Sequence, residues 1–321
     1  MAADDAKKPL WITWERQVRN RSMAGLIGAD YRELLCSRGR LQRYLWSARR
    51  TLALLWREQP TLVFCPNPSL VLTSLLLCAR PFLGYKLVVD AHFGGVEAYD
   101  DNPVLQFVLD TCNRCADLVV VTNPEHRQLV EEVGGRAFVM PDPLPDMPGV
   151  TGGPVAAKQV FFICSFDVDE PYLEVFEAAR RLAVEGFRLT VSGRFGKAGI
   201  IPDNFPHVSF LGFVDEAVYY ATLRSCELAI DLTHNDRCLV CGAYEAVAAH
   251  KPVVLSDKPA LRDYFKGGAV FVENDAESIA DGIRVAYRRR LELIDEASLW
   301  AAQERRNADS RRGQLAALTR S

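Results

Sequence analysis

No apolar run in this sequence of 321 residues is long enough to cross a membrane. The longest runs, such as Leu70–Ala79, are far shorter than the roughly 20 residues that a spanning helix needs. The N-terminal segment at 1–11 lacks the apolar core of a secretory signal peptide, so we expect a cytoplasmic protein. Short-period repeats and low-complexity tracts are also absent, which argues against a repeat protein.

Cysteine is present, but in a number that does not pair. The chain has nine cysteines, and in a reducing cytosol we expect free thiols. Two CxxC pairs, Cys112/Cys115 and Cys238/Cys241, could together be interpreted as a zinc site. Each pair lies in a helical pattern that merely places both cysteines on one face, whereas structural zinc pairs usually flank a tight turn. We therefore expect no metal site.

The net charge of −3 hides an uneven distribution. Residues 7–57 contain twelve Lys or Arg against three acidic residues, so the rest of the chain is acidic. Such a local excess indicates an anionic surface or ligand. Residues 38–57 in particular form a basic amphipathic pattern with Trp and Tyr, which could lie on an anionic membrane. The alternative is a helix that packs on the core and exposes a solvated basic face. We expect no nucleic-acid partner.

Apolar segments alternate with helical patterns along both halves of the chain. In the first half the expected strands are Leu10–Trp14, Ala29–Leu35, Thr61–Cys65, Lys86–Asp90, Leu118–Thr122 and Arg136–Met140. In the second half they are Gln159–Cys164, Phe187–Ser192, Val208–Leu211, Leu228–Leu232, Val253–Leu255 and Ala269–Val272. The helices between them include Leu41–Trp56, Leu70–Ala79, Pro103–Ala116, Glu125–Val133, Pro171–Glu185 and Glu216–Leu223. This alternation predicts an α/β fold with doubly wound parallel sheets.

A segment rich in proline and glycine separates the two halves. Residues 141–157 contain five Pro and three Gly without periodicity, which is typical of a hinge. We expect a Rossmann-like domain at 1–145, a linker at 146–157, a second Rossmann-like domain at 158–290 and a helical tail at 291–321. The two domains would face each other across a cleft, because open α/β sheets bind ligands at the carboxyl ends of their strands.

The stretch 232–257 has the clearest features of a ligand site. A polar turn follows an apolar strand there and leads into about three turns of helix that contain Glu245 and end at Pro252. Free N–H groups at the start of this helix, around Gly242 and Ala243, suit a phosphate group. The alternative is one more βαβ unit with a solvated glutamate on its helix.

Residues Gly242–Val254 are similar to the Glu-Ala-x-Ala-x-Gly-x-Pro-Val-Val segment of glycosyltransferases with the GT-B fold. The resemblance covers nearly the whole chain and implies two Rossmann-like domains, with 1–145 on the acceptor side and 158–290 binding the nucleotide-sugar. It also implies that Glu245 binds the ribose of a nucleotide-sugar, since a carboxylate can accept hydrogen bonds from both ribose hydroxyls. Further segments, Asn67–Ser69, Val88–His92 and Ser165–Glu170, resemble the dolichol-linked chitobiose mannosyltransferase and bacterial exopolysaccharide transferases. Those enzymes transfer a sugar to a lipid pyrophosphate carrier at the membrane.

Departures from this family leave the stereochemical course open. Arg237 stands where retaining members carry a second Glu, and Ser165–Glu170 is acidic where those members carry Arg and Lys. Arg194, Lys197 or Arg237 could supply the positive charge for the diphosphate instead. Both a retaining and an inverting transfer therefore stay open.

An inverting transfer needs a base near the acceptor hydroxyl and positive charge near the departing diphosphate. Asp90 and His92, at the end of a strand, are the catalytic candidates; the alternatives are a turn carboxylate and a histidine that only positions the sugar. Glu97, Asp100 and Asp101 are other possible bases. The expected donor-binding residues are Glu245, Arg194, Lys197, Arg237, Gly242, Ala243, Phe213 and Val214. The expected acceptor-binding residues are Arg16, Arg19, Arg21, Asn67, Gly94 and Gly95.

We therefore expect a metal-independent glycosyltransferase of hexosyltransferase type that uses no cofactor. It would move a sugar from a nucleotide-sugar to a lipid-linked or polysaccharide acceptor in cell-surface glycan synthesis. Residues 38–57 would make peripheral contact with the inner face of the membrane. One alternative is a sugar-nucleotide epimerase of the same architecture, which needs no acceptor. The other is a catalytically degenerate GT-B module that acts as a scaffold, a possibility raised by Arg237.

Overall fold

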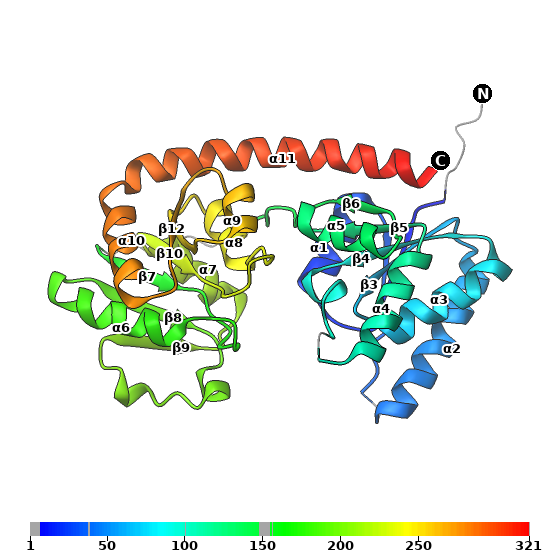
Figure 1. The fold of residues 1–321 in the computed structure, drawn as a ribbon, viewed down its shortest axis with the longest axis horizontal. Helices are drawn as coiled ribbons and strands as arrows, with labels where there is room; N and C mark the ends of the chain where they lie inside the picture. Colours follow the sequence, from blue (N-terminus) through cyan, green and yellow to red (C-terminus); the bar gives the residue numbers. More distant parts are fainter. Residues whose placement is uncertain (1–6, 38, 100, 148–154, 156, 321) are drawn as a thin grey trace. The chain divides into compact units, whose positions relative to one another are not determined.

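The computed structural model describes residues 7–37, 39–99, 101–147, 155 and 157–320, and these form two compact units (Figure 1). Unit 1 comprises Met1–Pro143 and Asn307–Ser321, and unit 2 comprises Leu144–Arg306. Most of the expected linker at 146–157 lies outside the described residues, and so do Arg38 and Asp100.

Unit 1 is built on a six-stranded parallel sheet with the order β2-β1-β3-β4-β5-β6. Its strands are β1 (Leu10–Thr13), β2 (Asp30–Glu33), β3 (Leu62–Asn67), β4 (Lys86–Ala91), β5 (Leu118–Val121) and β6 (Ala137–Val139). Successive side chains of a strand point to opposite faces. Ile12 and Val89 accordingly belong to one buried cluster, and Trp11 and Val88 belong to another. Both faces are therefore covered, as in other parallel sheets.

Helices from different parts of the chain cover the two faces of this sheet. Helices α2 (Arg40–Glu58), α3 (Leu70–Leu83) and α5 (Pro124–Glu132) contribute to the cluster that contains Ile12. Helix α1 (Val18–Ile27) and the end of α11 (Arg290–Arg320) contribute to the cluster of Trp11, the latter through Leu315. Helix α4 (Pro103–Cys115) packs against α3. No helix is expected from the sequence at α1, because polar residues and a glycine interrupt its apolar spacing.

Unit 2 repeats this plan with the strand order β12-β11-β10-β7-β8-β9. The strands are β7 (Gln159–Phe162), β8 (Arg188–Ser192), β9 (Val208–Gly212), β10 (Leu228–Asp231), β11 (Val253–Ser256) and β12 (Ala269–Val272). Helices α6 (Tyr172–Leu182) and α10 (Ala276–Arg288) cover one face. The other face is covered by α7 (Glu216–Ser225), α8 (Cys241–Ala248), α9 (Pro259–Tyr264) and the first part of α11.

In each sheet the chain reverses the direction in which strands are added. The reversal lies between β1 and β3 in unit 1 and between β7 and β10 in unit 2. In doubly wound sheets the loops at the carboxyl ends of such strands bind ligands. The expectation of two doubly wound parallel sheets is confirmed. None of the helices in the described ranges is both long and apolar enough to cross a membrane.

Candidate functional site

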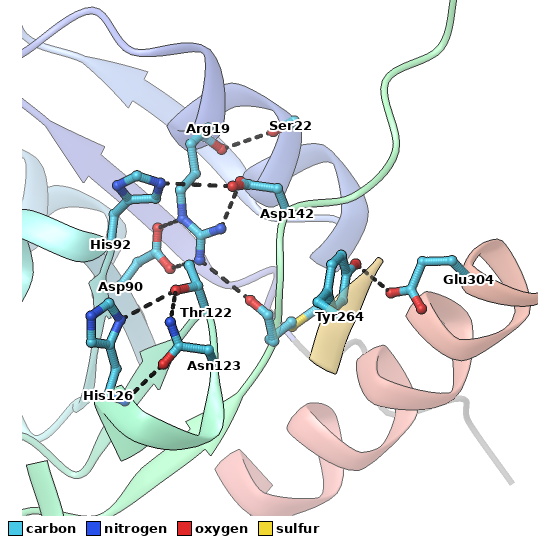
Figure 2. Close-up of polar contacts among 11 residues, drawn as sticks. Arg19, Ser22, Asp90, His92, Thr122, Asn123, His126, Asp142, Tyr264 and Glu304 are labelled. Carbon is cyan, nitrogen blue, oxygen red and sulfur yellow. Dashed lines mark hydrogen bonds and ion pairs between the residues drawn. The ribbon is translucent and has the colours of Figure 1, made fainter. Parts of the chain in front are cut away.

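The carboxyl edge of the sheet in unit 1 holds a buried cluster of charges around Arg19 (Figure 2). Arg19 lies on α1 and donates from Nε and Nη2 to the two carboxylate oxygens of Asp90, at 2.9 and 2.6 Å. Its Nη1 donates to Asp142 Oδ1 at 2.6 Å. The side chains of Arg19 and Asp90 are only 8% and 2% exposed. Burial alone would lower the pKa of Arg19, but the charges of Asp142 and Asp90 outweigh burial and raise this pKa above its ordinary value.

This cluster changes the interpretation of two predicted residues. Asp90 is expected to be a catalytic base, but both of its oxygens accept hydrogen bonds from one guanidinium in a buried setting. Arg19 is expected to bind the acceptor, yet its charge is balanced by two carboxylates. The sequence does not reveal these pairs, because they join positions 71 and 123 residues apart. Arg19 and Asp90 thus hold each other in place in this structure, and their assignments to the acceptor and to catalysis stay predictions.

His92 lies directly after β4 and faces Asp142 (Figure 2). Its Nε2 is 3.8 Å from Asp142 Oδ2, and its side chain is 35% exposed. Burial and the nearby charge of Arg19 lower the pKa of His92 below its ordinary value of 6.5, although Asp142 and Asp90 act in the opposite direction. The imidazole is thus neutral at pH 7 and able to accept a proton.

Asn67 and Gly95 connect the end of β3 to the turn after β4, through hydrogen bonds and a close backbone contact. Asn67 is buried, donates to Asn113 Oδ1 at 2.9 Å and accepts from Thr73 Oγ1 at 3.1 Å. Asn113 in turn donates to the carbonyl of Gly95 at 3.0 Å. A Cβ at Gly95 would lie 2.9 Å from the carbonyl oxygen of Asn67, so only glycine fits this approach. Both polar atoms of the Asn67 side chain are thus engaged inside the protein, and its assignment to the acceptor stays a prediction. Gly94 lies beside Gly95 in the half-buried turn.

Arg16 and Arg21 differ from Arg19 in their exposure. Both side chains extend into solvent, and their carboxylate neighbour is Glu33, at 3.6 and 4.0 Å. Exposed ion pairs of this length contribute little to stability, so both cations can be engaged by an external anion. Their assignment to the acceptor stays a prediction.

In unit 2, Glu245 lies on α8 and accepts a hydrogen bond from the hydroxyl of Tyr219 on α7. Burial raises the pKa of Glu245, and the Tyr219 hydrogen bond opposes this effect. The hydroxyl bonds Oε2, whereas Oε1 receives no hydrogen bond from the described residues. Tyr219 therefore fixes the carboxylate that the sequence assigns to the ribose. Sequence reasoning missed Tyr219, because nothing distinguishes it from other aromatic residues of an amphipathic helix.

The start of α8 is occupied by a carboxylate from the neighbouring strand. Asp231, at the end of β10, faces the backbone N–H groups of Gly242 and Ala243, which act to lower its pKa, and the Ala243 N–H also donates to the Val240 carbonyl at 3.3 Å. A Cβ at Gly242 would lie 2.6 Å from Asp231 Oδ2, so glycine makes room for this side chain. Burial, followed by the charges of Glu170 and Glu245, raises the pKa of Asp231 well above its ordinary value. These N–H groups are expected to hold a diphosphate, and the structure gives them an internal acceptor instead.

Asp231 is a site residue that the sequence analysis does not identify. An acidic residue in an otherwise apolar strand is a signal that could have revealed it. The helix that follows is also shorter than expected, with eight residues in place of about three turns. Cys238 precedes this helix and only Cys241 belongs to it, so the helical interpretation of that cysteine pair is wrong for Cys238.

Positive side chains near the ends of β7 and β8 have different surroundings. Lys197 forms an ion pair with Asp167, and this contact lowers the pKa of Asp167. Arg194 is exposed and places its Cζ 4.5 Å from the centre of the Phe213 ring, which is itself 74% exposed. Gly193 allows this arrangement, because its φ is +106° and any Cβ at this position would overlap the carbonyl oxygen of Cys164.

Two further predicted donor residues lie in loops. Arg237 has an exposed side chain in the loop between β10 and α8, and its backbone N–H donates to Asn235 Oδ1 at 2.9 Å. Val214 follows Phe213 and is half-buried. Within the described residues, no group of three His, Cys, Asp or Glu side chains is arranged to hold a metal ion. The predicted roles of Arg194, Arg237, Phe213 and Val214 stay predictions.

The chain is similar to known proteins along part of its sequence and in its fold. No family model matches the chain. Over 182 residues it is 28% identical to a phosphatidyl-myo-inositol mannosyltransferase of Mycobacterium leprae, a match that covers 51% of this chain and 48% of that protein. The chain thus spans about half the length of the curated relative that it matches.

Solved structures match along most of the chain. HepE of Anabaena in complex with UDP-glucose superposes with a TM-score of 0.75 at 13% identity, covering 97% of this chain and 99% of HepE. Sucrose-phosphate synthase of Thermosynechococcus elongatus gives 0.67 at 16% identity, covering 87% and 78%. MnaA of S. aureus with UDP gives 0.61 at 13% identity, covering 91% of each chain. At these identities the comparison establishes the fold. The chain has the two Rossmann-like units of the GT-B fold, and the resemblance found in its sequence is confirmed at that level.

Proposed function

We propose that this protein is a glycosyltransferase that takes its sugar from a nucleotide-sugar, with UDP-sugars as the first class to test. The observation that carries the proposal is Glu245, held by Tyr219 at the carboxyl edge of the second sheet, with Oε1 free of hydrogen bonds from the described residues. Support comes from the similarity to HepE, which was solved with UDP-glucose, and to MnaA, which was solved with UDP. The partial match to a mannosyltransferase agrees with sugar transfer.

The ribose, the base and the diphosphate of a nucleotide-sugar each have a candidate contact in unit 2. The ribose hydroxyls would donate to Glu245. The base would stack on the exposed ring of Phe213, whose other neighbour is the Arg194 guanidinium. The diphosphate would be contacted first by Arg194, because this side chain is exposed and lies over the Phe213 ring that would hold the base, whereas Lys197 is ion-paired with Asp167. Arg237, in the loop before α8, stays a further candidate from the sequence. This arrangement neutralises the leaving group without a metal ion.

On the acceptor side we propose a base and a membrane-facing helix. His92, neutral at pH 7, is the base that would take the proton of the acceptor hydroxyl in an inverting transfer. Helix α2 exposes Leu41, Leu45, Leu52 and Trp56 along one face, with arginines beside this stripe. A solvated basic face alone does not explain an exposed apolar stripe. An anionic membrane would bury the apolar side chains and attract the arginines beside them. We therefore infer a lipid-linked acceptor and a role in cell-surface glycan synthesis, with transfer of a hexose.

A scaffold without catalysis is the second candidate, because Asp231 occupies the start of α8 where a diphosphate is expected. Ligand binding separates the two. We would measure the affinity of UDP, GDP and ADP and of their sugars for the purified chain by calorimetry and thermal shift, since a ligand of the native state must raise the melting temperature. UDP or a UDP-sugar should bind, and the other nucleotides should bind more weakly.

The decisive variant is Glu245→Gln, with the exposed Glu277→Gln on α10 as the matched control. Hydrogen bonds to a charged group contribute about 1.5–3 kcal/mol, so Glu245→Gln should weaken binding roughly tenfold or more. Glu277→Gln should bind like the wild type. Equal affinity in the two variants would refute the donor site. A folded wild-type protein that binds no nucleotide would support the scaffold, and product from donor alone would indicate an epimerase.

A further inference from the structure

One carboxylate oxygen of Asp142 has no hydrogen bond, although it is buried. Asp142 Oδ1 accepts from Arg19 Nη1 at 2.6 Å. Its Oδ2 is buried and has no hydrogen-bond partner among the described residues. A buried acceptor that lacks a donor is costly, so this atom is expected to have a function or a partner. The group it faces is His92 Nε2, at 3.8 Å (Figure 2).

The charge balance of the cluster also indicates that Asp142 acts on His92. Arg19 is matched by Asp90 through a two-pronged ion pair, so Asp142 adds a second negative charge against a single positive one. The oxygen of Asp142 that does not bond Arg19, Oδ2, faces His92. A proton on His92 Nε2 would meet this oxygen, and a small rotation of the partly exposed ring would shorten the contact to a hydrogen bond. Catalytic hydrogen bonds are often longer than ideal before substrate binds.

The tautomer of His92 follows from this contact. When the hydrogen of a neutral imidazole is on Nε2, the lone pair is on Nδ1. Within the described part of the chain, no residue forms a hydrogen bond with His92 Nδ1 that would use this lone pair. A carboxylate that fixes the tautomer of a histidine base and stabilises the imidazolium is a known arrangement in hydrolases.

We propose that Asp142 is a positioning residue that holds the His92 proton on Nε2 and leaves Nδ1 as the proton acceptor. The proposal rests on the proposed function, because it assigns the base of that transfer. The acceptor hydroxyl gives its proton to Nδ1 while its oxygen forms a bond to the anomeric carbon of the donor sugar. The bond from this carbon to the diphosphate breaks, and its electron pair leaves with the diphosphate. Asp142 stabilises the imidazolium that results.

Arg19 and Asp90 have a supporting role in this arrangement. Arg19 Nη1 fixes the carboxylate of Asp142, and its other donors are fixed by Asp90 and by the Met140 carbonyl at 3.4 Å. Asp90, the base expected from the sequence, is thereby separated from the acceptor by Arg19, Asp142 and His92. The charged groups around His92 come from three elements: Arg19 on α1, Asp90 on β4 and Asp142 after β6. Removing the charge of Asp142 alone should lower the pKa of His92, because the cation stays.

The test uses nuclear magnetic resonance on the full chain with isotope-labelled histidine. The chain has five histidines, and the His92→Gln variant assigns the signal of His92. Wild-type His92 should show the Nε2–H tautomer. Asp142→Asn should lower the pKa of His92 by about one unit or more, as expected for loss of an opposite charge at this range. The exposed Asp146→Asn, four residues further along, is the matched control and should change neither property.

Several outcomes would overturn the proposal. An Nδ1–H tautomer in the wild type would do so without any variant, so the test stands even if Asp142→Asn does not fold. An unchanged pKa in a folded Asp142→Asn protein would also overturn it. These measurements need neither donor nor acceptor. If they agree with expectation and the wild type transfers no sugar, the proposed function fails while the His92–Asp142 pair stands.

Once a donor and an acceptor are known, the kinetics provide a second test. Asp142→Asn should lower kcat at least tenfold with little change in KM, and it should move the acidic limb of the kcat profile to lower pH. Asp142→Glu, which keeps the charge, should recover part of kcat. A kcat and pH profile equal to those of the wild type would show that Asp142 does not position the base.

Discussion

Replacement of Arg19 by methionine tests the charge cluster of unit 1 most directly. Arg19→Met keeps much of the side-chain volume but removes the one cation between two carboxylates, whose side chains are 2% and 14% exposed. Removing one partner of a buried ion pair costs about 3–5 kcal/mol, because the remaining charge stays buried without compensation. For a unit of this size a change of 1 kcal/mol corresponds to roughly 2–4 °C in Tm, so we expect a loss of roughly 6–20 °C.

Denaturant unfolding followed by tryptophan fluorescence can measure this loss in unit 1. Of the five tryptophans, Trp11, Trp14, Trp46 and Trp56 lie in unit 1 and only Trp300 lies in unit 2. The fluorescence transition therefore reports mainly on the unit that carries the substitution.

A second substitution separates the charge effect from a packing defect. Arg19→Met combined with Asp90→Asn should recover part of the lost stability, because one of the two unpaired charges is removed together with its partner. A loss below about 1 kcal/mol in the single variant would refute the argument. A second result would also refute it. If Asp90→Asn lowers the stability of the Arg19→Met variant by as much as it lowers that of the wild type, the two residues act independently.

Two further predictions concern Asp231 and helix α2. Because burial and two neighbouring carboxylates raise the pKa of Asp231, its contribution to stability is fully present below the unfolded-state value of about 3.9 and is lost as pH rises through the folded-state pKa. Asp231→Asn, which mimics the protonated acid, should therefore make unit 2 more stable than the wild type at pH 8 but not at pH 4. The control variant, Asp263→Asn at an exposed position, should show no such difference. If Asp231→Asn and the wild type have the same dependence of Tm on pH, the prediction is wrong. Trp56 on α2 is 72% exposed within the apolar stripe, and Trp56→Ala should reduce sedimentation with anionic lipid vesicles severalfold. The control Phe82→Ala removes another exposed aromatic ring, from α3, and should sediment like the wild type; equal loss in both variants would exclude α2 as the contact.

The fold could be predicted from the sequence because the strands of both sheets are buried on both faces. Such strands are continuous apolar runs, and the expected Ala269–Val272 and Lys86–Asp90 correspond closely to β12 and β4. Helix α1 could not be predicted in this way, since Arg and Asn residues interrupt its apolar spacing and its packing comes from only a few side chains such as Met23. Helix α9, with six residues, is too short to show a period.

The candidate site was predictable only where a single segment carries the signal. Glu245 stands in a contiguous motif, so its neighbours in the sequence identify it. Tyr219 is 26 residues away from Glu245 in the sequence, and Asp142 is 123 residues away from Arg19. These contacts depend on which strands are adjacent in the sheets. A single sequence does not show which distant side chains meet, because that depends on the order of the strands and the positions of the helices.

The predicted phosphate-binding residues show why a charged side chain alone does not define a site. From the sequence, Arg19 and Lys197 are expected to be available to a phosphate. In the structure, Arg19 forms an ion pair with Asp90, and Lys197 forms one with Asp167. Arg16, Arg21 and Arg194 have weak or no carboxylate partners among the described residues and keep their charge toward solvent. An incoming phosphate gains little from a cation that is already paired, because it must compete with the internal carboxylate. The anion sites of this protein should therefore be sought at the exposed arginines, and the buried Arg19 should be assigned to holding the loop that carries His92.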